Sequence, residues 1–462
     1  MLFIQGLSRG RIPLEYHIDK NEVLVMGKKE IGIGILGLGH VGGGVLKILD
    51  QQRAFIEQEI SPYQIKVIGL ADLDIGRKPE SKRDNPFFTT SAQEVIGHSD
   101  IQIVVETIGG EYPAYELIKK ALQSGKHVVT PNKEVVAKHG YELLAIAHQN
   151  KVQFLFETSV GSAIPILGVI LNMLTSGPLE EISGILNGTT NYILDLMWEY
   201  NMSQQEALSK AQEKGYAEAD SSKDIMGLDT LYKIFILASL GFRARLNLNQ
   251  ISYSGINEIT LEDVQLVKQL AYRIKLLATA RRKESKVDIR ISPVLIEDGQ
   301  LLAHIHGADN GIFLSGYGYG NLFFSGAGAG GIAGASMIIS DIIRIIRQPH
   351  YFEYGFLLKD SEELKIQRFD QLGNQYFLKV KLENGEKNKE NIQNIFSKNN
   401  LFIKKTAEIK SEDEDNSLTM GIITDLGEES RFKRIYSEIK ELSYTRTINY
   451  LEVYRNAKNK SF

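Results

Sequence analysis

The chain has 462 residues, of which 43% are hydrophobic and 24% charged, a balance typical of soluble globular proteins with two or three domains. Its net charge of −4 argues against a nucleic-acid-binding surface, and its apolar runs are too short to span a membrane, so we expect neither partner. The sequence contains no cysteine, which excludes disulfides and thiolate catalysis and is compatible with a cytoplasmic location.

Residues 1–29 do not resemble a secretory signal, because they carry early charges and lack a long apolar core. Two interpretations compete for this N-terminal extension. It is an accessory segment, or the start codon has been assigned too early and Met26 is the natural first residue. We favour the second.

Residues 30–156 alternate short apolar runs with helical patterns, which predicts an α/β domain with a Rossmann-type doubly wound parallel sheet. The first run leads into a glycine-rich turn and then a helix, the context in which such a turn binds a dinucleotide. The expected strands are Ile31–Leu36, Ile65–Ala71, Ile101–Thr107, His127–Thr130 and Val152–Phe156.

The glycine-rich turn has residues suited to a pyrophosphate. Gly37 permits the tight turn, Gly39 lets backbone amides approach phosphate, and Gly42 allows close helix–strand packing. Together with His40 and Val41, these residues form the predicted phosphate site. The alternative is a glycine-rich turn with no ligand.

The choice between NAD and NADP depends on the end of the second strand. Asp72 can bind both ribose hydroxyls there, which favours NAD. Arg77 and Lys78 lie just downstream and could instead receive a 2′-phosphate, so the choice stays open, and we lean to NAD. Thr107, at the end of the third strand, is a further candidate cofactor contact.

Residues 157–325 read as an α+β substrate and dimerisation domain, with long helices such as the one opened by a capping box at Ser203. Between Val287 and Phe324, many apolar strand residues alternate with small ones, in a domain too small to bury both faces alone. This pattern favours a homodimer or homotetramer. His304 and His306 are expected on a strand, with a role in the fold rather than in metal binding.

Residues 215–233 place three acids and a lysine in a loop that runs into an apolar helix. Asp229 and Lys233 are four residues apart and share one helix face, while Glu218 and Asp224 precede them. Carboxylates around an amine suit a small zwitterionic substrate, because acids hold an ammonium group and a lysine can move a proton. The alternative is a solvated surface ion pair.

Residues 326–348 contain a glycine-rich loop followed by a helix expected to return to the nucleotide domain. Gly328 in this loop either approaches the nucleotide or serves tight packing. Residues 375–462 then predict a ferredoxin-like βαββαβ module. Its expected elements are strand Tyr376–Glu383, helix Lys389–Ser397, strands Leu401–Ile409 and Ser417–Thr424, helix Glu428–Leu442 and strand Thr447–Tyr454.

From Ile31 to Arg347 the chain resembles homoserine dehydrogenase in five ordered blocks. Four positions depart from the usual pattern: Pro131 stands where alanine is usual, Ser162 and Ala163 where small residues, often glycine, are expected, and Ser221 where proline is common. The chain has no aspartate kinase domain, so it resembles the monofunctional form. The matching blocks are Gly37–Gly42, Val128–Lys133, Glu157–Ile166, Gly184–Leu194 and Glu218–Lys233.

This resemblance implies reversible reduction of L-aspartate 4-semialdehyde to L-homoserine with NAD(P)H, in threonine, methionine and isoleucine biosynthesis. It implies that Lys233 is the general acid and that Lys133 lies near the carbonyl and the nicotinamide. Glu218, Asp224 and Asp229 would then hold the substrate ammonium group. The resemblance also implies dimer formation through the substrate domain.

The resemblance further implies a monovalent cation such as sodium, bound by Glu157 and by main-chain oxygens near Val160, Ser162 and Ile164. The alternative for Glu157 is a structural cap. The C-terminal module resembles a divergent ACT domain. The ligand loop of such domains contains Asp-x-Pro-Gly, whereas the corresponding turn at residues 383–387 has no proline, which argues against amino-acid feedback through it.

Two other functions are compatible with this architecture. One is another amino-acid dehydrogenase, against which the string from Asn187 to Asn191 argues. The other is a non-catalytic dinucleotide sensor, which the presence of both Lys133 and Lys233 argues against.

Overall fold

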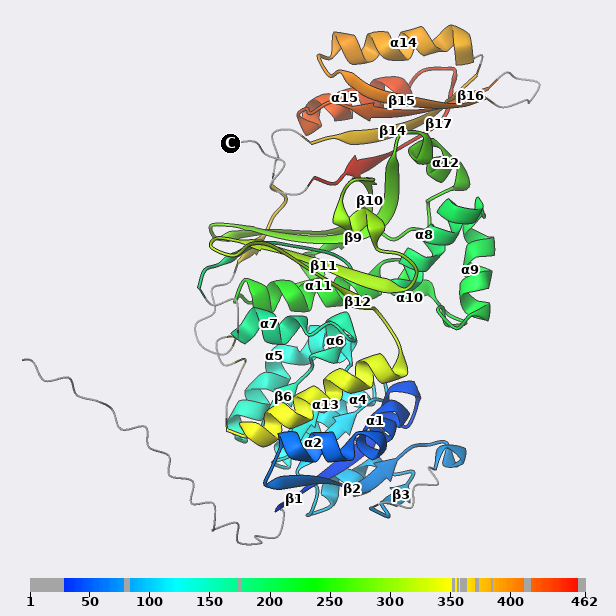
Figure 1. Ribbon diagram of the computed structural model, residues 1–462. Coiled ribbons are helices and arrows are strands. Elements are labelled where there is room, and N and C mark those ends of the chain that lie inside the picture. Colours follow the sequence, from blue (N-terminus) through cyan, green and yellow to red (C-terminus); the bar gives the residue numbers. More distant parts are fainter. Residues whose placement is uncertain are drawn as a thin grey trace, which may run out of the picture.

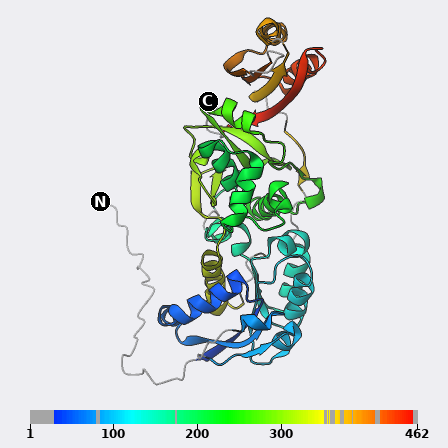
Figure 2. The ribbon, with the colours of Figure 1, turned by 90° about the vertical axis from the view of Figure 1, so that its right-hand side faces the viewer.

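The computed structural model describes residues 29–78, 84–172, 176–350, 354, 357, 364–369, 374–383, 385–410 and 417–455, so the predicted N-terminal extension lies outside the described residues except for Lys29. Two sheets organise the chain, a parallel one at the base of Figure 1 and a larger mixed one above it. Figure 2 shows the C-terminal module at the end of the molecule farthest from the nucleotide domain. Within the described part of the chain, no helix is long and apolar enough to cross a membrane.

The sheet at the base has six parallel strands in the order β3-β2-β1-β4-β5-β6, which confirms the predicted doubly wound domain. Only β3 was not predicted, because three half-buried residues give too short a hydrophobic pattern to recognise. The strands are β1 Lys29–Leu36, β2 Tyr63–Ala71, β3 Phe87–Thr89, β4 Ile103–Glu106, β5 His127–Val129 and β6 Phe154–Leu155.

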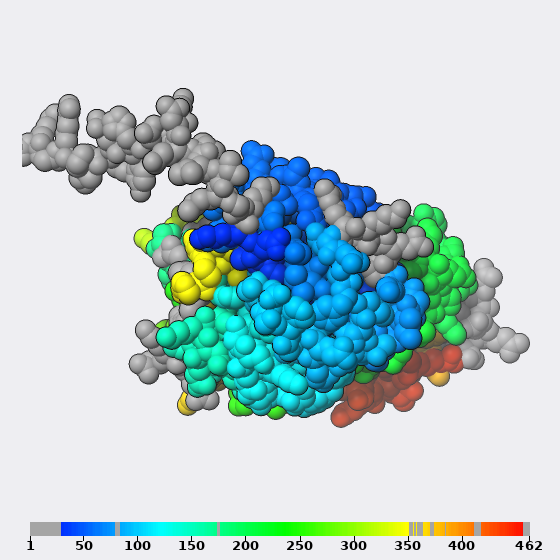
Figure 3. All heavy atoms as spheres, turned by 90° about the horizontal axis from the view of Figure 1, so that it is seen from below, coloured from blue at the N-terminus to red at the C-terminus, as the bar shows by residue number. Residues whose placement is uncertain are grey.

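Helices cover both faces of this sheet, and a late helix joins them (Figure 1). This helix, α13, packs along α1 of the nucleotide domain. The contact requires glycine, since a Cβ on Gly44 would lie 2.6 Å from the carbonyl oxygen of Gly331. Figure 3 shows α13 (yellow) among the blue and cyan atoms of the nucleotide domain. The helices are α1 His40–Gln51, α2 Arg53–Glu59, α3 Ala92–Gly97, α4 Ala114–Gln123, α5 Lys133–Gln149 and α13 Gly331–Arg347.

The larger sheet has 11 strands, with the main order β12-β11-β7-β9-β10-β17-β14-β16-β15 and with β8 and β13 paired to β10. Its strands are β7 Leu179–Ile185, β8 Ser252–Tyr253, β9 Tyr272–Lys283, β10 Lys286–Glu297, β11 Asp309–Gly316, β12 Gly320–Ala327, β13 Lys365–Ile366, β14 Tyr376–Leu382, β15 Ile403–Lys410, β16 Leu418–Thr424 and β17 Thr445–Val453. The helices of the substrate domain are α6 Thr158–Gly161, α7 Ile166–Asn172, α8 Gly188–Tyr200, α9 Gln204–Glu213, α10 Ser222–Ile225, α11 Leu228–Gly241 and α12 Leu261–Gln269.

Two details differ from the expectations for this domain. Strand β12 runs to Ala327, two residues beyond the expected boundary at residue 325. The expectation that His304 and His306 lie on a strand was wrong, because Leu301–His304 forms a 3-10 helix. Gly307 then turns with a φ of 59°, and the imidazole of His306 lies 3.3 Å from Asp195, so side-chain contacts decide the path of this loop.

The C-terminal module has the predicted βαββαβ order, with helices α14 Gly385–Lys398 and α15 Glu429–Lys440. Its four strands are antiparallel and ordered β17-β14-β16-β15, which is the ferredoxin-like arrangement. Helix α14 begins four residues before the predicted start at Lys389, so most of the predicted turn is helical. An exposed ion pair between Glu386 and Lys410 at 2.7 Å links this first turn to β15.

The module does not form a separate sheet. Strand β17 pairs in parallel with β10, so one sheet runs from the substrate domain into the module. Beyond β17, the buried hydroxyl of Tyr454 donates to Glu181 on β7 at 3.1 Å. On the other side of the junction, Lys379 of β14 pairs with Asp263 of α12 at 2.8 Å, with both side chains buried. Sequence patterns could not predict these contacts, because each joins segments more than 100 residues apart.

We expect Lys379→Ala to destabilise the chain by about 3–5 kcal/mol, because it leaves the carboxylate of Asp263 buried without its cation. Urea unfolding followed by circular dichroism measures the loss. Lys404→Ala is the control, since Lys404 is an exposed residue of β15 in the same module. Equal unfolding midpoints for the two variants would contradict a stabilising role for the buried pair.

Candidate active site

The centre of the site is a buried carboxylate between two lysines. Asp229 and Lys233 lie one turn apart on α11, with Oδ2 and Nζ 2.8 Å apart. From the nucleotide domain, Nζ of Lys133 at the start of α5 lies 2.9 Å from Oδ1 of Asp229. Asp229 and Lys233 are only 5% and 8% exposed, so the alternative of a solvated surface pair is excluded.

The charges of this group stabilise one another. Burial alone would raise the pKa of Asp229, but the ammonium groups of Lys133 and Lys233 and the amide of Asn187 hold it well below its usual range. The charge of Asp229 raises the pKa of Lys133 against the effect of burial. At neutral pH, Asp229 is therefore a carboxylate and Lys133 an ammonium group.

Asn187 joins Asp229 on α11 to Asp224 on α10, and the sequence did not mark it as a site residue. Its Nδ2 donates to Asp224 at 2.7 Å and to Asp229 at 2.9 Å. Its Oδ1 accepts from the amide of Thr190 at 2.8 Å and caps α8. Asparagine before Gly188 at the end of an apolar strand is a recognisable helix cap. Its two acidic partners lie 37 and 42 residues away, where local patterns carry no signal.

Lys233 is fixed at two points. Besides Asp229, its Nζ donates to the carbonyl of Leu186 at 2.7 Å, and the amide of Asn310 donates to the same carbonyl at 3.3 Å. An ammonium group has three N–H donors, so among the described contacts one donor is left for a substrate oxygen.

The two remaining predicted acids lie at the edge of this group. Asp224, on α10, has a raised pKa because of burial and because of the nearby charge of Asp229. Glu218 is exposed in the preceding loop, and its charge contributes to the raised pKa of Lys133. The structure thus brings together the three acids and both lysines named from the sequence. Three carboxylates against two ammonium groups favour a cationic ligand group.

Lys133 is positioned by a chain of buried hydrogen bonds that the sequence did not reveal. Glu106 at the end of β4 accepts from the hydroxyl of Thr130 at 2.5 Å and from the amide of Ile108 at 2.6 Å. The same hydroxyl accepts from the amide of Asn132, whose side chain caps α5. Burial raises the pKa of Glu106, and these donors oppose the effect.

The glycine-rich turn fits a pyrophosphate. Gly37 has a φ of 90°, and a Cβ on Gly42 would lie 2.0 Å from the carbonyl oxygen of Gly37, so both positions require glycine. Gly39, the cap of α1, faces open space, since the nearest group to a Cβ placed there would be Arg77 at 4.0 Å. An anion can therefore reach the amides at the start of α1.

Asp72, directly after β2, organises this turn. Its Oδ2 accepts from the amide of Leu38 at 2.6 Å and its Oδ1 from the amide of Asp74 at 2.9 Å. Burial alone would raise the pKa of Asp72, but these amides and the guanidinium of Arg77 together lower it. Asp72 therefore stays anionic at neutral pH.

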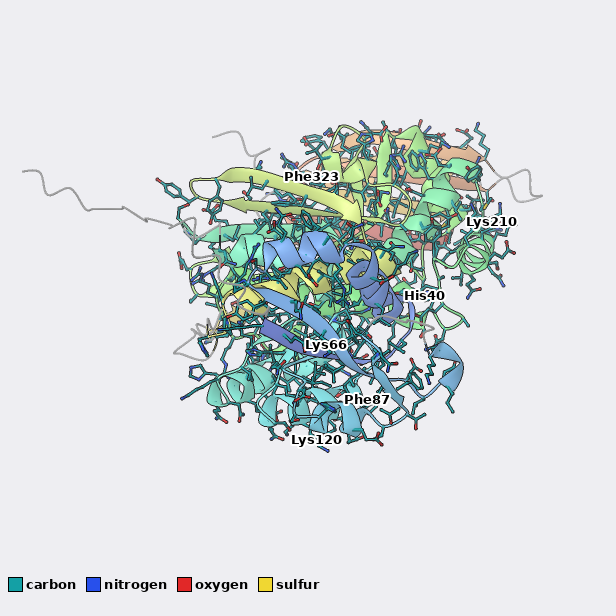
Figure 4. The ribbon with its side chains drawn as sticks, turned by 60° about the horizontal axis from the view of Figure 1, so that its bottom comes forward. His40, Lys66, Phe87, Lys120, Lys210 and Phe323 are labelled. Carbon is teal, nitrogen blue, oxygen red and sulfur yellow. The ribbon has the colours of Figure 1, made fainter. Side chains whose placement is uncertain are left out.

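Three other predicted cofactor contacts, His40, Val41 and Thr107, lie at or beside the same turn, whereas Gly328 does not. His40 is exposed at the start of α1 (Figure 4), and Val41 follows it, half-buried. Thr107 donates from its hydroxyl to the carbonyl of Gly37 at 2.7 Å, so it fixes the turn. Gly328 contacts the substrate domain, since a Cβ there would lie 2.2 Å from Oδ1 of Asn310, which supports its packing role.

The carboxylate of Glu157 does not fit the predicted cation site. It accepts from the amides of Leu167 at 2.6 Å and Gly168 at 2.8 Å, and Arg344 lies 3.3 Å away. Glu157 therefore caps α7, the alternative considered from the sequence. Among the described residues, no three acids or histidines cluster as metal ligands. The remaining predicted contacts, Val160, Ser162 and Ile164, are all buried in the adjoining turn.

Comparisons with known proteins agree with this arrangement. The family described as homoserine dehydrogenase matches residues 165–343, and its NAD binding domain matches residues 37–157. The homoserine dehydrogenase of Bacillus subtilis (strain 168) is 33% identical over 422 residues, 91% of this chain and 97% of the relative. The homoserine dehydrogenase of Synechocystis sp. is 39% identical over 321 residues, 68% of this chain and 73% of the relative.

Solved structures give the same result. A homoserine dehydrogenase from Thiobacillus denitrificans superposes with a TM-score of 0.82 at 32% identity, over 92% of this chain and 98% of the other. A hyperthermophilic archaeal homoserine dehydrogenase, solved in complex with NADPH, superposes with a TM-score of 0.58 at 25% identity, over 68% of this chain and 97% of the other. The chain belongs to the homoserine dehydrogenase family and is an NAD(P)-dependent oxidoreductase that interconverts L-aspartate 4-semialdehyde and L-homoserine.

Proposed function

We propose that Lys233 is the general acid of this reaction and that Lys133 stabilises the charge that develops on the substrate oxygen. The observation that carries the proposal is the buried carboxylate of Asp229, which contacts both ammonium groups at 2.8 and 2.9 Å. It holds two cations beside one another at the point where the nucleotide and substrate domains meet.

The dinucleotide, when bound, supplies or accepts the hydride. During reduction, negative charge builds up on the aldehyde oxygen and must be neutralised where it forms. Lys233 has one donor beyond its contacts with Asp229 and Leu186, and this donor serves the substrate oxygen. In the oxidative direction the same amine takes the hydroxyl proton.

The substrate ammonium group is assigned to the acids at the edge of the site. Asp229 is occupied by two lysines, which leaves Asp224 and Glu218 as the carboxylates that face the ligand. Asn187 orients Asp224 through the bond of 2.7 Å. The rival of a non-catalytic sensor is disfavoured, since a mere binding module has no need of two lysines held on one buried acid.

Lys233→Ala is expected to lower kcat by about 10²–10⁴, the usual loss for one proton-transfer group, and to leave cofactor binding nearly intact. Steady-state oxidation of homoserine and fluorescence titration with NADH measure the two effects. Lys210→Ala is the control, because this exposed lysine lies on α9, outside the site (Figure 4). Near-wild-type turnover of the Lys233 variant at neutral pH would show that another group donates the proton.

We also propose that NAD is preferred over NADP. Asp72 stays anionic beside the ribose position, and Arg77 is shared between Asp72 at 3.5 Å and Asp74 at 3.4 Å. Two carboxylates around one guanidinium leave a net negative charge, which repels a 2′-phosphate. The archaeal relative solved with NADPH is the counter-argument, so NADP binding is part of the expectation.

Asp72→Ala is expected to narrow the ratio of kcat/KM for NAD to that for NADP, because it removes the repulsion and releases Arg77. Arg77→Ala is the matched variant and is expected to widen the ratio. Initial rates with both cofactors measure it. A wild-type enzyme that strongly prefers NADP, with the same preference in Asp72→Ala, would show that this carboxylate does not discriminate.

We propose that a monovalent cation such as sodium is bound only by main-chain oxygens near Val160, Ser162 and Ile164. Ser162 has a φ of 52°, so the backbone turns sharply at this point. Glu157 serves as the cap of α7, and the cation takes no part in any step of the reaction proposed above.

We also propose a cytoplasmic location, an expectation that rests on composition.

We propose that the chain forms a homodimer or homotetramer through the larger sheet. Strand β12 forms one edge of this sheet, and its residues Leu322, Phe323 and Phe324 are only half-buried. Figure 4 shows Phe323 on this outer strand. An apolar edge strand of eight residues is unusual in a soluble protein unless another chain covers it.

Light scattering at micromolar concentration is expected to give two or four times the mass of one chain, because the edge at β12 needs a partner. The measurement at several dilutions separates a stable oligomer from weak association. A monomer at micromolar concentration would rule the proposal out.

A further inference from the structure

Helix α5 of the nucleotide domain reaches the substrate domain with its first two residues. Lys133 contacts Asp229, as described above, and Glu134 contacts Lys223, with Oε2 and Nζ 2.8 Å apart. Lys223 lies on α10, in the loop that carries the substrate acids. Adjacent positions of one helix thus bind two different segments of the other domain, and Figure 1 shows α5 close to α11.

Two other side chains hold Glu134 in place for this contact. Lys138, one turn along α5, pairs with its Oε1 at 2.8 Å, and the hydroxyl of Tyr232 on α11 lies 3.5 Å away. Lys138 is itself tied to Glu111 at 2.6 Å. Burial alone would raise the pKa of Glu134, but Lys138 and Lys223 lower it, so this carboxylate is ionised at neutral pH.

Movement of Lys223 carries Asp224 with it, because the two residues are adjacent on α10. Residues 216–226, which include α10, are flanked by two glycines. Both adopt a backbone conformation that other residues rarely adopt, with φ of 74° at Gly215 and 86° at Gly227. Within this segment, Asp224 is held from the substrate domain by Asn187, and the contact of Lys223 with Glu134 comes from the nucleotide domain.

We propose that the Lys223–Glu134 ion pair is a latch that draws residues 216–226 against the nucleotide domain and so positions Asp224 for the substrate ammonium group. Lys223 is a positioning residue, since it acts through Asp224. The side chain of Lys223 is 60% exposed and that of Glu134 12%, so the ammonium group of the pair stays in contact with solvent and the pair responds to ionic strength. The effect on substrate affinity rests on the role proposed for Asp224.

The latch is tested first without turnover, by amide hydrogen exchange of residues 216–226 in the full chain. Lys223→Gln is expected to speed exchange in this segment about two- to fivefold, the range for an exposed ion pair. Lys138→Gln is the matched control, because it removes the other cation from Glu134, and the described contacts of Lys138 with Glu111, Glu134 and the ring of Tyr232 do not involve residues 216–226. Lys223→Arg is expected to restore slow exchange.

The second arm measures kinetics with homoserine. In Lys223→Gln, KM for homoserine is expected to rise about two- to fivefold, with kcat and the affinity for NADH little changed. Raising ionic strength with choline chloride, which adds no alkali cation, raises the wild-type KM and has less effect on the variant. In the Lys223→Gln background, Glu134→Gln adds no further rise, because the pair is already broken.

The outcomes separate the latch from the assignment beneath it. Unchanged exchange in Lys223→Gln, or an equal change in Lys138→Gln, overturns the latch whatever the activity. Faster exchange in Lys223→Gln with an unchanged KM for homoserine would show that the ion pair holds the segment but does not affect substrate binding. The role proposed for Asp224 would then be wrong. A fall in NADH affinity would show that the pair supports the nucleotide domain instead.

Discussion

The site depends on the contact of the Asp229 carboxylate with two lysines from two domains. Lys233 comes from the same helix, whereas Lys133 comes from the first turn of α5 in the nucleotide domain. A buried carboxylate without both cations would be costly. The same contact that neutralises Asp229 therefore joins the domains and holds two ammonium groups side by side, where we propose that the substrate carbonyl binds.

The surrounding structure fixes the members of this contact. Asn187 caps α8 and holds Asp224 and Asp229, while the carbonyl of Leu186 anchors Lys233. On the nucleotide side, buried Glu106 orders the segment that precedes Lys133. Each chemical group is thus held by a capped helix or the end of a strand, which preserves its geometry when a ligand enters.

The C-terminal module is joined to the substrate domain by one continuous sheet. Strand β17 extends the substrate-domain sheet, and Tyr454 contacts Glu181 on β7, the strand that leads directly to Leu186 and Asn187. Burial of Lys379 against Asp263 fixes the module from α12. A displacement of the module would therefore act on β7, the strand that supports the site.

Short-range patterns along the chain were enough to predict five of the six strands of the nucleotide domain, the turn at Gly37, the βαββαβ module and the family. Hydrophobic periodicity, glycine conformation and cap residues act within a few positions, and the helical spacing of Asp229 and Lys233 belongs to the same class. Only the tertiary structure shows that Lys133 contacts Asp229 and that Asn187 joins two acids. It also shows that Glu157 caps α7 and that the C-terminal module continues the sheet of the substrate domain. These contacts join residues 10 to more than 150 positions apart, and the packing of distant segments sets such distances rather than local preference.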